Sequence, residues 1–297
     1  MWINELESNH KNVKILASTQ NPVYLIEDNN EFILIEGGLS RDASLFLNQL
    51  YKHVGDLNKI THWIILHAHY DHCGLIPYIA PLLKHVTLWA SEKAIKNFKS
   101  LKSLKVIEQL NKEVLAIGSN EDNSFKFNSC TLEELTYQEL IEGHRYQFTE
   151  NYHFEIISTP GHSPCSISLW EPSKSLCFVS DCLGEIITEK HWFPLIFQDP
   201  VLYLKSIKKI ESCNAKNLFL GHNGILTGST ATTCFNYIFN SITSLKIQTD
   251  QIKTQQSLDQ FSKKLHQSYK KNSQDFVPKT LHLLSMKRLV KLLKNQS

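Results

Sequence analysis

The chain has 297 residues, of which 42% are hydrophobic, so it is long and apolar enough to form a substantial core. No basic region followed by an apolar run opens the chain, and no stretch approaches the length of a membrane span, so we expect a cytoplasmic protein with no membrane span. Seven cysteines without CxxC spacing argue against a disulfide framework and against a four-thiolate zinc site.

The net charge is only +2, but it is unevenly distributed. From Lys246 onward there are eleven Lys or Arg and three Asp, a net +8, whereas residues 1–245 hold 20 Lys or Arg and 26 Asp or Glu, a net −6. Such a basic segment can face nucleic acid, a membrane surface or a phosphorylated ligand, or form the solvated face of a helix. Its lack of interleaved aromatic residues argues against a nucleic-acid partner.

The first part of the chain alternates β-rich runs with turn residues. Ser40 is a candidate cap for the first helix, and Pro77 is tolerable only in the first turn of the next one. In chain order we predict strands at 13–18, 22–27 and 32–36, a helix at 40–54, a strand at 61–66, a helix from 75, a strand at 86–90 and a long amphipathic helix at 91–114.

The second part contains β-type runs at 153–158, 166–170, 176–180 and 217–220, and helices dominate after about residue 228. Strands in two halves with helices between them favour an α+β fold. We therefore expect two sheets packed face to face and covered outside by helices.

The stretch HAHYDHCG at 67–74 holds three histidines and an aspartate within six residues, directly after the apolar run WIIL. Neither a surface loop nor a core has a packing reason for that composition, whereas metal ligation explains it. In an extended backbone His67, His69 and Asp71 point to one side, while His72 needs a turn of the chain. The spacing suits two neighbouring metals.

Three later stretches have the same form, a β-rich run that ends in a ligand-type residue. They are IISTPGHS with His162, CFVSDCLG with Asp181 and LFLGHNG with His222. Alone, each such residue is more often a turn or capping residue, but together they indicate a metal centre. Imidazole and carboxylate ligands favour zinc, iron or manganese. The nearby Cys73, Cys165 and Cys182 are alternative ligands or a redox switch, but we interpret them as small buried side chains.

The HxHxDH motif with the three later residues resembles the complete signature of the metallo-β-lactamase superfamily, which implies an αβ/βα sandwich with two divalent metal ions. In redox members of that superfamily Glu replaces the second motif residue, which is His69 here, so hydrolysis is preferred. By this resemblance the first metal is held by His67, His69 and His162, the second by Asp71, His72 and His222, and Asp181 bridges them.

Longer stretches resemble one subgroup, the PqsE family of quinolone-signal response proteins with 2-aminobenzoylacetyl-CoA thioesterase activity. They are LIEGGLSRDASL, HAHYDHCGLIPYI, SDCLGE and SQDFVPKTLHLLSMKRL. The resemblance implies a metallo-β-lactamase-fold domain at 1–240 and a helical extension at 241–297 that lies over the site. It also places Glu185 at the polar end of the substrate and Ser285 within hydrogen-bonding distance of it.

Each of these pocket residues has an alternative interpretation. Ser285 precedes MKRLVKLLK, an apolar stripe, and is also a candidate N-cap of the last helix. Glu185 is also a candidate solvated loop carboxylate. HWFPLIF at 191–197 is either an aromatic pocket wall or ordinary core.

The resulting hypothesis is a thioesterase that cleaves an aromatic β-keto acyl-CoA with a metal-bridging hydroxide, in which Asp181 and Asp71 are catalytic and Asp71 moves a proton. The alternatives are a hydrolase of another small ester, lactone or glutathione thioester, and a quorum-sensing-type signalling protein that acts by partner binding. The segment FNSITSLKIQTDQIK lacks the arginine cluster that the resembling family uses for its protein partner, so no protein partner is identified.

Overall fold

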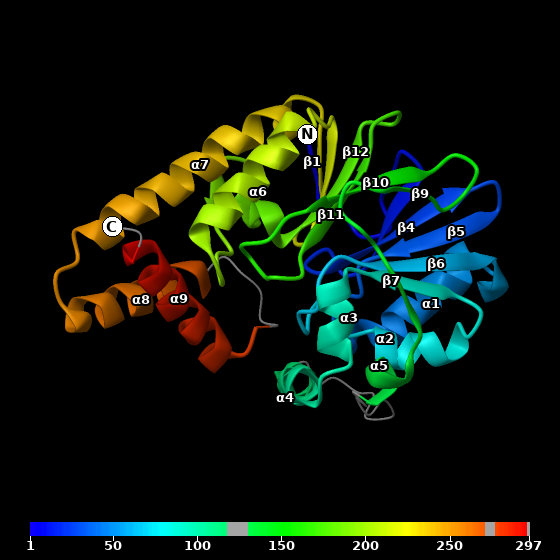
Figure 1. Ribbon diagram of the computed structural model, residues 1–297, viewed down its shortest axis with the longest axis horizontal. Coiled ribbons are helices and arrows are strands. Elements are labelled where there is room, and N and C mark those ends of the chain that lie inside the picture. Colours follow the sequence, from blue (N-terminus) through cyan, green and yellow to red (C-terminus); the bar gives the residue numbers. More distant parts are fainter. Residues whose placement is uncertain (118–129, 271–276, 296–297) are drawn as a thin grey trace.

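The computed structural model describes residues 1–117, 130–270 and 277–295, so the first four residues of SQDFVPKTLHLLSMKRL, 273–276, lie outside the described residues. Two seven-stranded sheets lie face to face, and helices cover the outer side of each sheet (Figure 1). The predicted α+β sandwich with a C-terminal helical region is therefore confirmed.

The first sheet is antiparallel from β2 to β5 and parallel from β5 to β8. Asn29 and Asn30 have φ angles of 46° and 68° and form the tight turn between β4 and β5. The strands are β2 (Asn9–His10), β3 (Val13–Ala17), β4 (Pro22–Asp28), β5 (Glu31–Ile35), β6 (Ile60–Ile65), β7 (Thr87–Ala90) and β8 (Tyr137–Glu139).

The second sheet has the strand order β1-β16-β15-β12-β11-β10-β9. Its parallel pair, β12 and β15, is connected through a helix, as a parallel connection requires. Its strands are β1 (Trp2–Ile3), β9 (Arg145–Gln147), β10 (His153–Ser158), β11 (Ile167–Glu171), β12 (Leu176–Ser180), β15 (Asn217–Leu220) and β16 (Ile225–Thr227), and the separate hairpin is β13 (Glu185–Thr188) with β14 (His191–Phe193).

The helices form the outer layers. Those of the first half pack on the first sheet, and those after β14 pack on the second. They are α1 (Ala43–His53), α2 (Ile76–Ile79), α3 (Glu92–Phe98), α4 (Leu101–Ile117), α5 (Cys130–Glu134), α6 (Pro200–Ser212), α7 (Ser229–Asp250), α8 (Gln255–Lys270) and α9 (Lys279–Lys294).

A buried aromatic group joins the two sheets between their facing sides. Phe178 and Phe219 stack with ring centroids 4.3 Å apart, and the ring of Tyr24 from the first sheet meets both edge to face. The Tyr24 hydroxyl lies 2.6 Å from the Leu220 carbonyl oxygen and 2.9 Å from that of Gly224. This contact ties β4 to the loop that carries His222.

Two predicted helices are shorter than the sequence pattern indicated. The helix expected from residue 75 ends at Ile79 and continues only as a 3-10 turn (Ala80–Leu82), because Pro81 lacks the N–H that another helical turn requires. The single helix expected at 91–114 is divided into α3 and α4. Ser40 lies inside a 3-10 turn (Ser40–Asp42) and makes no capping hydrogen bond to α1, so the predicted cap is wrong.

The predicted boundary between residues 240 and 241 lies within α7, which runs unbroken from Ser229 to Asp250. The division into two domains stays a prediction. Among the described residues, no helix is both long enough and apolar enough to cross a bilayer.

Candidate metal centre

The candidate ligands lie in loops at the carboxyl ends of strands, which hold side chains rigidly at the edge of the sandwich. The HAHYDH loop follows β6, and His72 N–H bonds to the His69 carbonyl 3.0 Å away in the turn that the sequence predicted. Asp181 follows β12 and His222 follows β15. The structure thus brings residues from distant parts of the chain to one place.

The described residues form three overlapping groups of possible ligand atoms, in each of which all atoms lie within 4.8 Å of one another. They are His67, His69, His162 and Asp181; Asp71, His72 and His222; and Glu36, His67 and His72. The seven predicted ligands make up the first two groups, and their assignment to two metals stays a prediction.

Asp181 lies at the junction of the two groups. Its Oδ2 is 3.1 Å from Nε2 of His162 and 3.8 Å from Nε2 of His67. Its Oδ1 is 3.3 Å from Nε2 of His72 and 3.4 Å from Nε2 of His222. Each carboxylate oxygen therefore faces one pair of imidazoles, which is the arrangement of a carboxylate that can bridge two cations.

The far sides of several imidazoles are fixed by hydrogen bonds. Nδ1 of His162 lies 2.8 Å from the Leu195 carbonyl, and Nδ1 of His222 lies 2.9 Å from the Gln20 carbonyl. With the proton on Nδ1, each Nε2 presents its lone pair to the centre. Such fixed tautomers are typical of metal-binding histidines.

Two buried imidazole nitrogens without hydrogen-bond partners among the described residues indicate that this group of side chains suits a metal. Nε2 of His67 and Nε2 of His72 have no hydrogen-bond partner within the described part of the chain. Buried polar atoms without partners are rare because burial without a hydrogen bond is costly. Both atoms face Asp181, so a divalent cation with nitrogen and oxygen ligands fits the residues present.

Burial favours the neutral form of three histidines. It lowers the pKa of His67 and His69 well below the usual range, and repulsion from neighbouring histidines adds to this effect. Burial also lowers the pKa of His162, although Asp181 opposes it. Neutral imidazole is the form that binds a metal.

For His72, His222 and Asp181, the charged neighbours together affect the pKa more than burial does. Burial lowers the pKa of His72 and of His222, but Asp181 and other carboxylates outweigh it and raise these values to about 9 and about 10. Burial would raise the pKa of Asp181, but His72 and His222 hold it well below its usual range. The centre thus combines an ionised carboxylate with basic imidazoles.

The sequence analysis missed Glu36, a buried carboxylate at the end of β5. The Ser180 hydroxyl donates to its Oε1 over 2.5 Å, and its Oε2 lies 3.4 Å from Nδ1 of His72. Glu36 and Ser180 have φ angles of 73° and 48°, a strained conformation for residues with side chains. The signal in the sequence was a carboxylate at a strand end before Gly37, where a Cβ would lie 2.6 Å from the His72 carbonyl oxygen.

Asn21 was missed as well. Its Nδ2 donates to Oδ2 of Asp71 over 3.2 Å and lies 3.3 Å from Nδ1 of His222. Asn21 lies 50 residues before Asp71 and 201 residues before His222, so no local sequence pattern could have indicated these contacts.

A cavity of about 540 Å³ opens above the centre. Five of the seven candidate ligands line its floor, and its walls are largely apolar; the five are His69, Asp71, His162, Asp181 and His222. The walls come from the segment around β14 (Phe193, Leu195, Phe197), from α4 (Val106, Leu110) and from α9 with the residue before it (Val277, Leu281, Leu284, Met286). HWFPLIF therefore supplies wall residues, while its Trp192 is buried in the core.

Glu185 and Ser285 both line this cavity, where the sequence analysis expected them. Glu185 Oε1 accepts a hydrogen bond from Asn223 Nδ2 over 3.2 Å, and burial raises the pKa of Glu185. Ser285 lies in the middle of α9, whose N-cap is Pro278, so the capping interpretation of Ser285 is wrong. Their roles toward a substrate stay predictions.

Cys73, Cys165 and Cys182 are buried, as predicted. Cys73 packs among the apolar residues of the first sheet and its helices, and Cys182 among those of the second. Burial raises the pKa of both thiols, which disfavours the thiolate that metal ligation needs.

Solved structures share this architecture. An archaeal metallo-beta-lactamase superfamily protein, ST1585 from Sulfolobus tokodaii, superposes with a TM-score of 0.58 at 16% identity over 83% of this chain and 91% of that protein. A metallo-beta-lactamase family protein, TTHA1429 from Thermus thermophilus, has a TM-score of 0.59 at 15% identity over 96% and 91%. The chain has the metallo-beta-lactamase fold.

The model of the metallo-beta-lactamase superfamily matches residues 18–132. The chain is 23% identical to the "Probable metallo-hydrolase YflN" of Bacillus subtilis (strain 168) over 75% of this chain and 88% of that protein. It is 34% identical to the "Beta-lactamase-like protein 2 homolog" of Caenorhabditis elegans over 73 residues, 24% of this chain and 22% of that relative.

Proposed function

We propose that the protein is a dinuclear metal-dependent hydrolase. The position of Asp181 carries this proposal, because its two oxygens face two different groups of histidines at the floor of an open cavity. At the level of the superfamily, the family match and the relative named as a metallo-hydrolase support a hydrolase-type enzyme.

The residues that would hold the metals are the seven that the sequence predicted. Zinc, iron and manganese all suit imidazole and carboxylate ligands. When bound, two such ions would lower the pKa of a water molecule and polarise the substrate carbonyl group. One site would use His67, His69 and His162, the other Asp71, His72 and His222, with Asp181 shared.

Within the hydrolases we propose a thioesterase that acts on an aromatic β-keto acyl-CoA. Three features support this substrate class: the resemblance to quinolone-signal response proteins, the apolar wall of Phe193, Leu195 and Phe197, and the polar Glu185 and Ser285 in the same cavity. An aromatic acyl group would bury apolar surface against that wall, while its keto and amino groups need polar partners.

The cleavage forms a C–O bond from water to the carbonyl carbon and breaks the C–S bond. The products are a carboxylic acid and a thiol, so no other reactant is needed. We assign to the Asp71 carboxylate, held by Asn21, the acceptance of the proton that the water loses. Because a thiolate is a good leaving group, the site needs no strong general acid.

The test is thiol release from a panel of acyl-CoA thioesters with metal-quantified wild type and Asp181→Asn. We expect metal-dependent turnover of aromatic β-keto thioesters, and a loss of at least one metal and most activity in Asp181→Asn. Asp259→Asn on α8 is the matched control and retains both. Asp181→Asn with two metals and full activity would refute the bridging role.

If metal-loaded wild type turns over no thioester, the substrate assignment fails. Lactones, other small esters and glutathione thioesters are then the next panel, since they need the same centre. The partner-binding alternative predicts a different result. A protein partner would be retained in a pull-down by wild type and by Asp181→Asn, but not by a variant in which the lysines from Lys246 onward are neutralised.

A further inference from the structure

A second cavity lies beside the metal cavity, between α6, α7 and α9. Its volume is about 700 Å³. We call it the basic groove. Its rim holds Lys205 and Lys208 of α6 and Lys246 of α7, and its floor is apolar, formed by Val201, Leu204 and Leu292. Val201 is 51% exposed, so its side chain is accessible from the groove.

The lysines of the groove are not neutralised equally. Lys246 pairs with Asp250 one turn along α7. Among the described residues neither Lys205 nor Lys208 forms an ion pair, whereas Lys209 pairs with Glu142 at 2.7 Å. The carboxylate of Asp199 is engaged at the start of α6, where its Oδ1 accepts hydrogen bonds from two backbone N–H groups. The negative charge of Asp199 remains, but Lys205 and Lys208 outnumber it, so the groove keeps a net positive charge.

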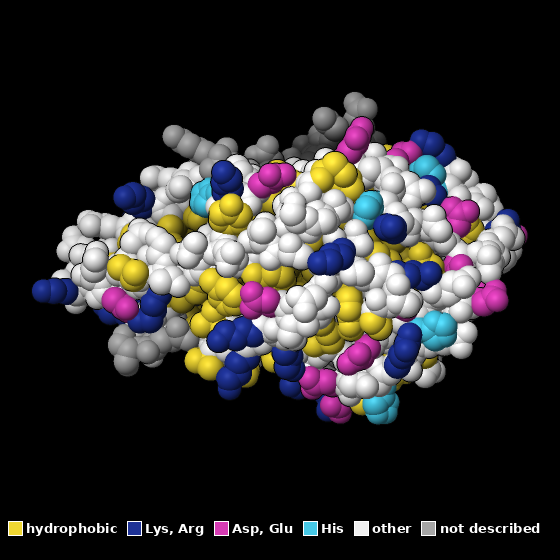
Figure 2. Space-filling view, turned by 90° about the horizontal axis from the view of Figure 1, so that it is seen from above, with side chains coloured by type: hydrophobic (Ala, Val, Ile, Leu, Met, Phe, Trp, Pro, Cys, Tyr) yellow, Lys and Arg dark blue, Asp and Glu magenta, His cyan; other side chains and the backbone are white. Residues whose placement is uncertain are grey.

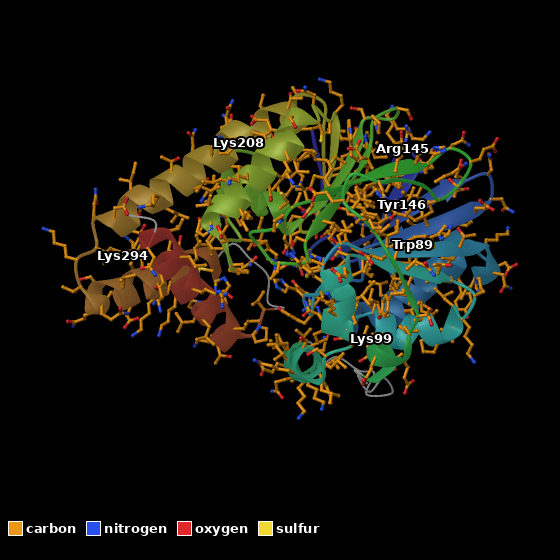
Figure 3. All side chains as sticks on the ribbon, in the orientation of Figure 1. Trp89, Lys99, Arg145, Tyr146, Lys208 and Lys294 are labelled. Atoms are coloured by element: carbon orange, nitrogen blue, oxygen red, sulfur yellow. The ribbon has the colours of Figure 1, made fainter. Side chains whose placement is uncertain are left out.

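Figure 2 shows Lys and Arg side chains spread over the face seen from above, some of them beside apolar side chains and others beside Asp and Glu. Lys208 lies on α6 and Lys294 near the end of α9, both in the half of the molecule formed by the C-terminal helices (Figure 3).

The groove and the metal cavity are adjacent. Gln198 lines both of them. On α9, Arg288 lines the metal cavity and Leu292, one helical turn further, lines the groove. Nε of Arg288 donates to the carbonyl oxygen of Phe197, so the guanidinium is held where the two cavities meet. The two cavities therefore share a wall formed by Gln198 and one turn of α9.

We propose that the basic groove binds the 3′-phosphorylated ADP end of a CoA thioester whose acyl end lies in the metal cavity. This inference rests on the proposed thioesterase function and specifies how the substrate is recognised. The phosphates meet Lys205, Lys208 and Lys246, and the adenine ring covers Val201 and Leu292. The pantetheine arm passes Gln198 and Arg288 between the cavities.

The combination of groups favours this ligand over a simple anion. Inorganic phosphate would use the lysines but leave the apolar floor exposed. A purely apolar ligand would cover the floor but would leave the lysine charge unused. A nucleotide with several phosphates and a long uncharged arm uses the rim, the floor and the connection to the metal cavity together.

The first test is binding of adenosine 3′,5′-bisphosphate, the nucleotide end of CoA, by isothermal titration calorimetry. It needs no catalysis and so separates this inference from the proposed function. We expect saturable binding that CoA displaces and that weakens as salt increases. Exposed charge contacts contribute up to about fivefold each, so Lys205→Ala/Lys208→Ala should weaken binding on the order of tenfold.

The control is Lys209→Ala/Lys216→Ala, which removes the same charge from exposed positions outside the groove and should leave binding unchanged. Absence of binding, or an equal loss in both variants, would overturn the proposal. So would equal displacement by inorganic phosphate, because that result would indicate a general anion site.

The second test compares the acyl-CoA thioester with the pantetheine thioester of the same acid. Lys205→Ala/Lys208→Ala should raise KM for the CoA thioester about tenfold and leave kcat and the pantetheine thioester unchanged. If the variant changes KM for both substrates alike, the groove does not bind the nucleotide. If wild type cleaves neither substrate, the proposed function fails, and the calorimetry alone tests whether the groove binds the nucleotide.

Discussion

A Cβ atom on Gly221 would lie 2.2 Å from Oδ1 of Asp181, so the residue before His222 leaves room for the shared carboxylate. Real Cβ atoms do not approach other heavy atoms so closely, and the neighbouring Ser180 carbonyl carbon, 2.8 Å away, prevents a simple shift. Gly221 is therefore a requirement of the position that Asp181 takes in the candidate metal centre.

We predict that Gly221→Ala displaces Asp181 and weakens metal retention at least about tenfold. The measurement is metal content by elemental analysis after dialysis against a series of chelator concentrations. Gly55→Ala is the control: its Cβ would meet nothing within 4 Å, but its φ of 74° strains any side chain, so this variant shows the effect of destabilisation away from the centre. A Gly221→Ala protein that keeps two metals at the wild-type chelator concentration would contradict this interpretation of the contact.

Glu36 acts through His72 and Ser180, so its charge should matter for metal binding without contact to the metal. Glu36→Gln keeps the size of the side chain but removes the negative charge near Nδ1 of His72. We expect metal affinity to fall about 10- to 100-fold, measured by competition with a chromogenic chelator.

The matched control is Glu171→Gln, another fully buried carboxylate, which accepts hydrogen bonds from His153 N–H and from Ser173. It should lower thermal stability but leave metal affinity unchanged. Equal metal affinity in the two variants would exclude a specific role of Glu36.

The ligands could be predicted from the sequence because metal binding restricts residue types strongly and places them at strand ends. Glu36 and Asn21 could not, because their roles depend on contacts with distant segments. The helical pattern of the sequence also did not indicate the break between α3 and α4. Phe98 stacks on Tyr137 at 5.3 Å, and the Lys99 ammonium reaches the Leu135 carbonyl over 2.8 Å, so tertiary contacts end α3 where its local pattern continues.

Asp28, at the end of β4, joins the two sheets. Burial would raise its pKa, but donors from Thr149 and Asn151, 2.6 and 2.9 Å away, outweigh this and lower it. Because the pKa is lower in the folded state, ionised Asp28 stabilises the fold above the unfolded value of about 4, and this contribution is lost as pH falls through the folded value.

At pH 7 we therefore expect Asp28→Asn to lower the free energy of unfolding by about 1.5–3 kcal/mol. In urea denaturation between pH 3 and 7, the difference from wild type should be constant above about pH 5 and shrink below about pH 4. Asp259→Asn should stay within about 0.5 kcal/mol of wild type throughout. A difference for Asp28→Asn that persists undiminished at pH 3 would show that the ionised form is not responsible.

Ser285 lies inside α9 and lines the metal cavity, so its hydroxyl is available to a substrate and is not needed to begin the helix. We predict that Ser285→Ala raises KM for the aromatic β-keto thioester about two- to tenfold, the effect of one lost hydrogen bond, with kcat and thermal stability nearly unchanged. Steady-state kinetics and a melting curve check both parts. Thr280→Ala, exposed on the same helix, is the control. An unchanged KM would remove Ser285 from substrate binding, and a large drop in melting temperature would assign it to the packing of α9 instead.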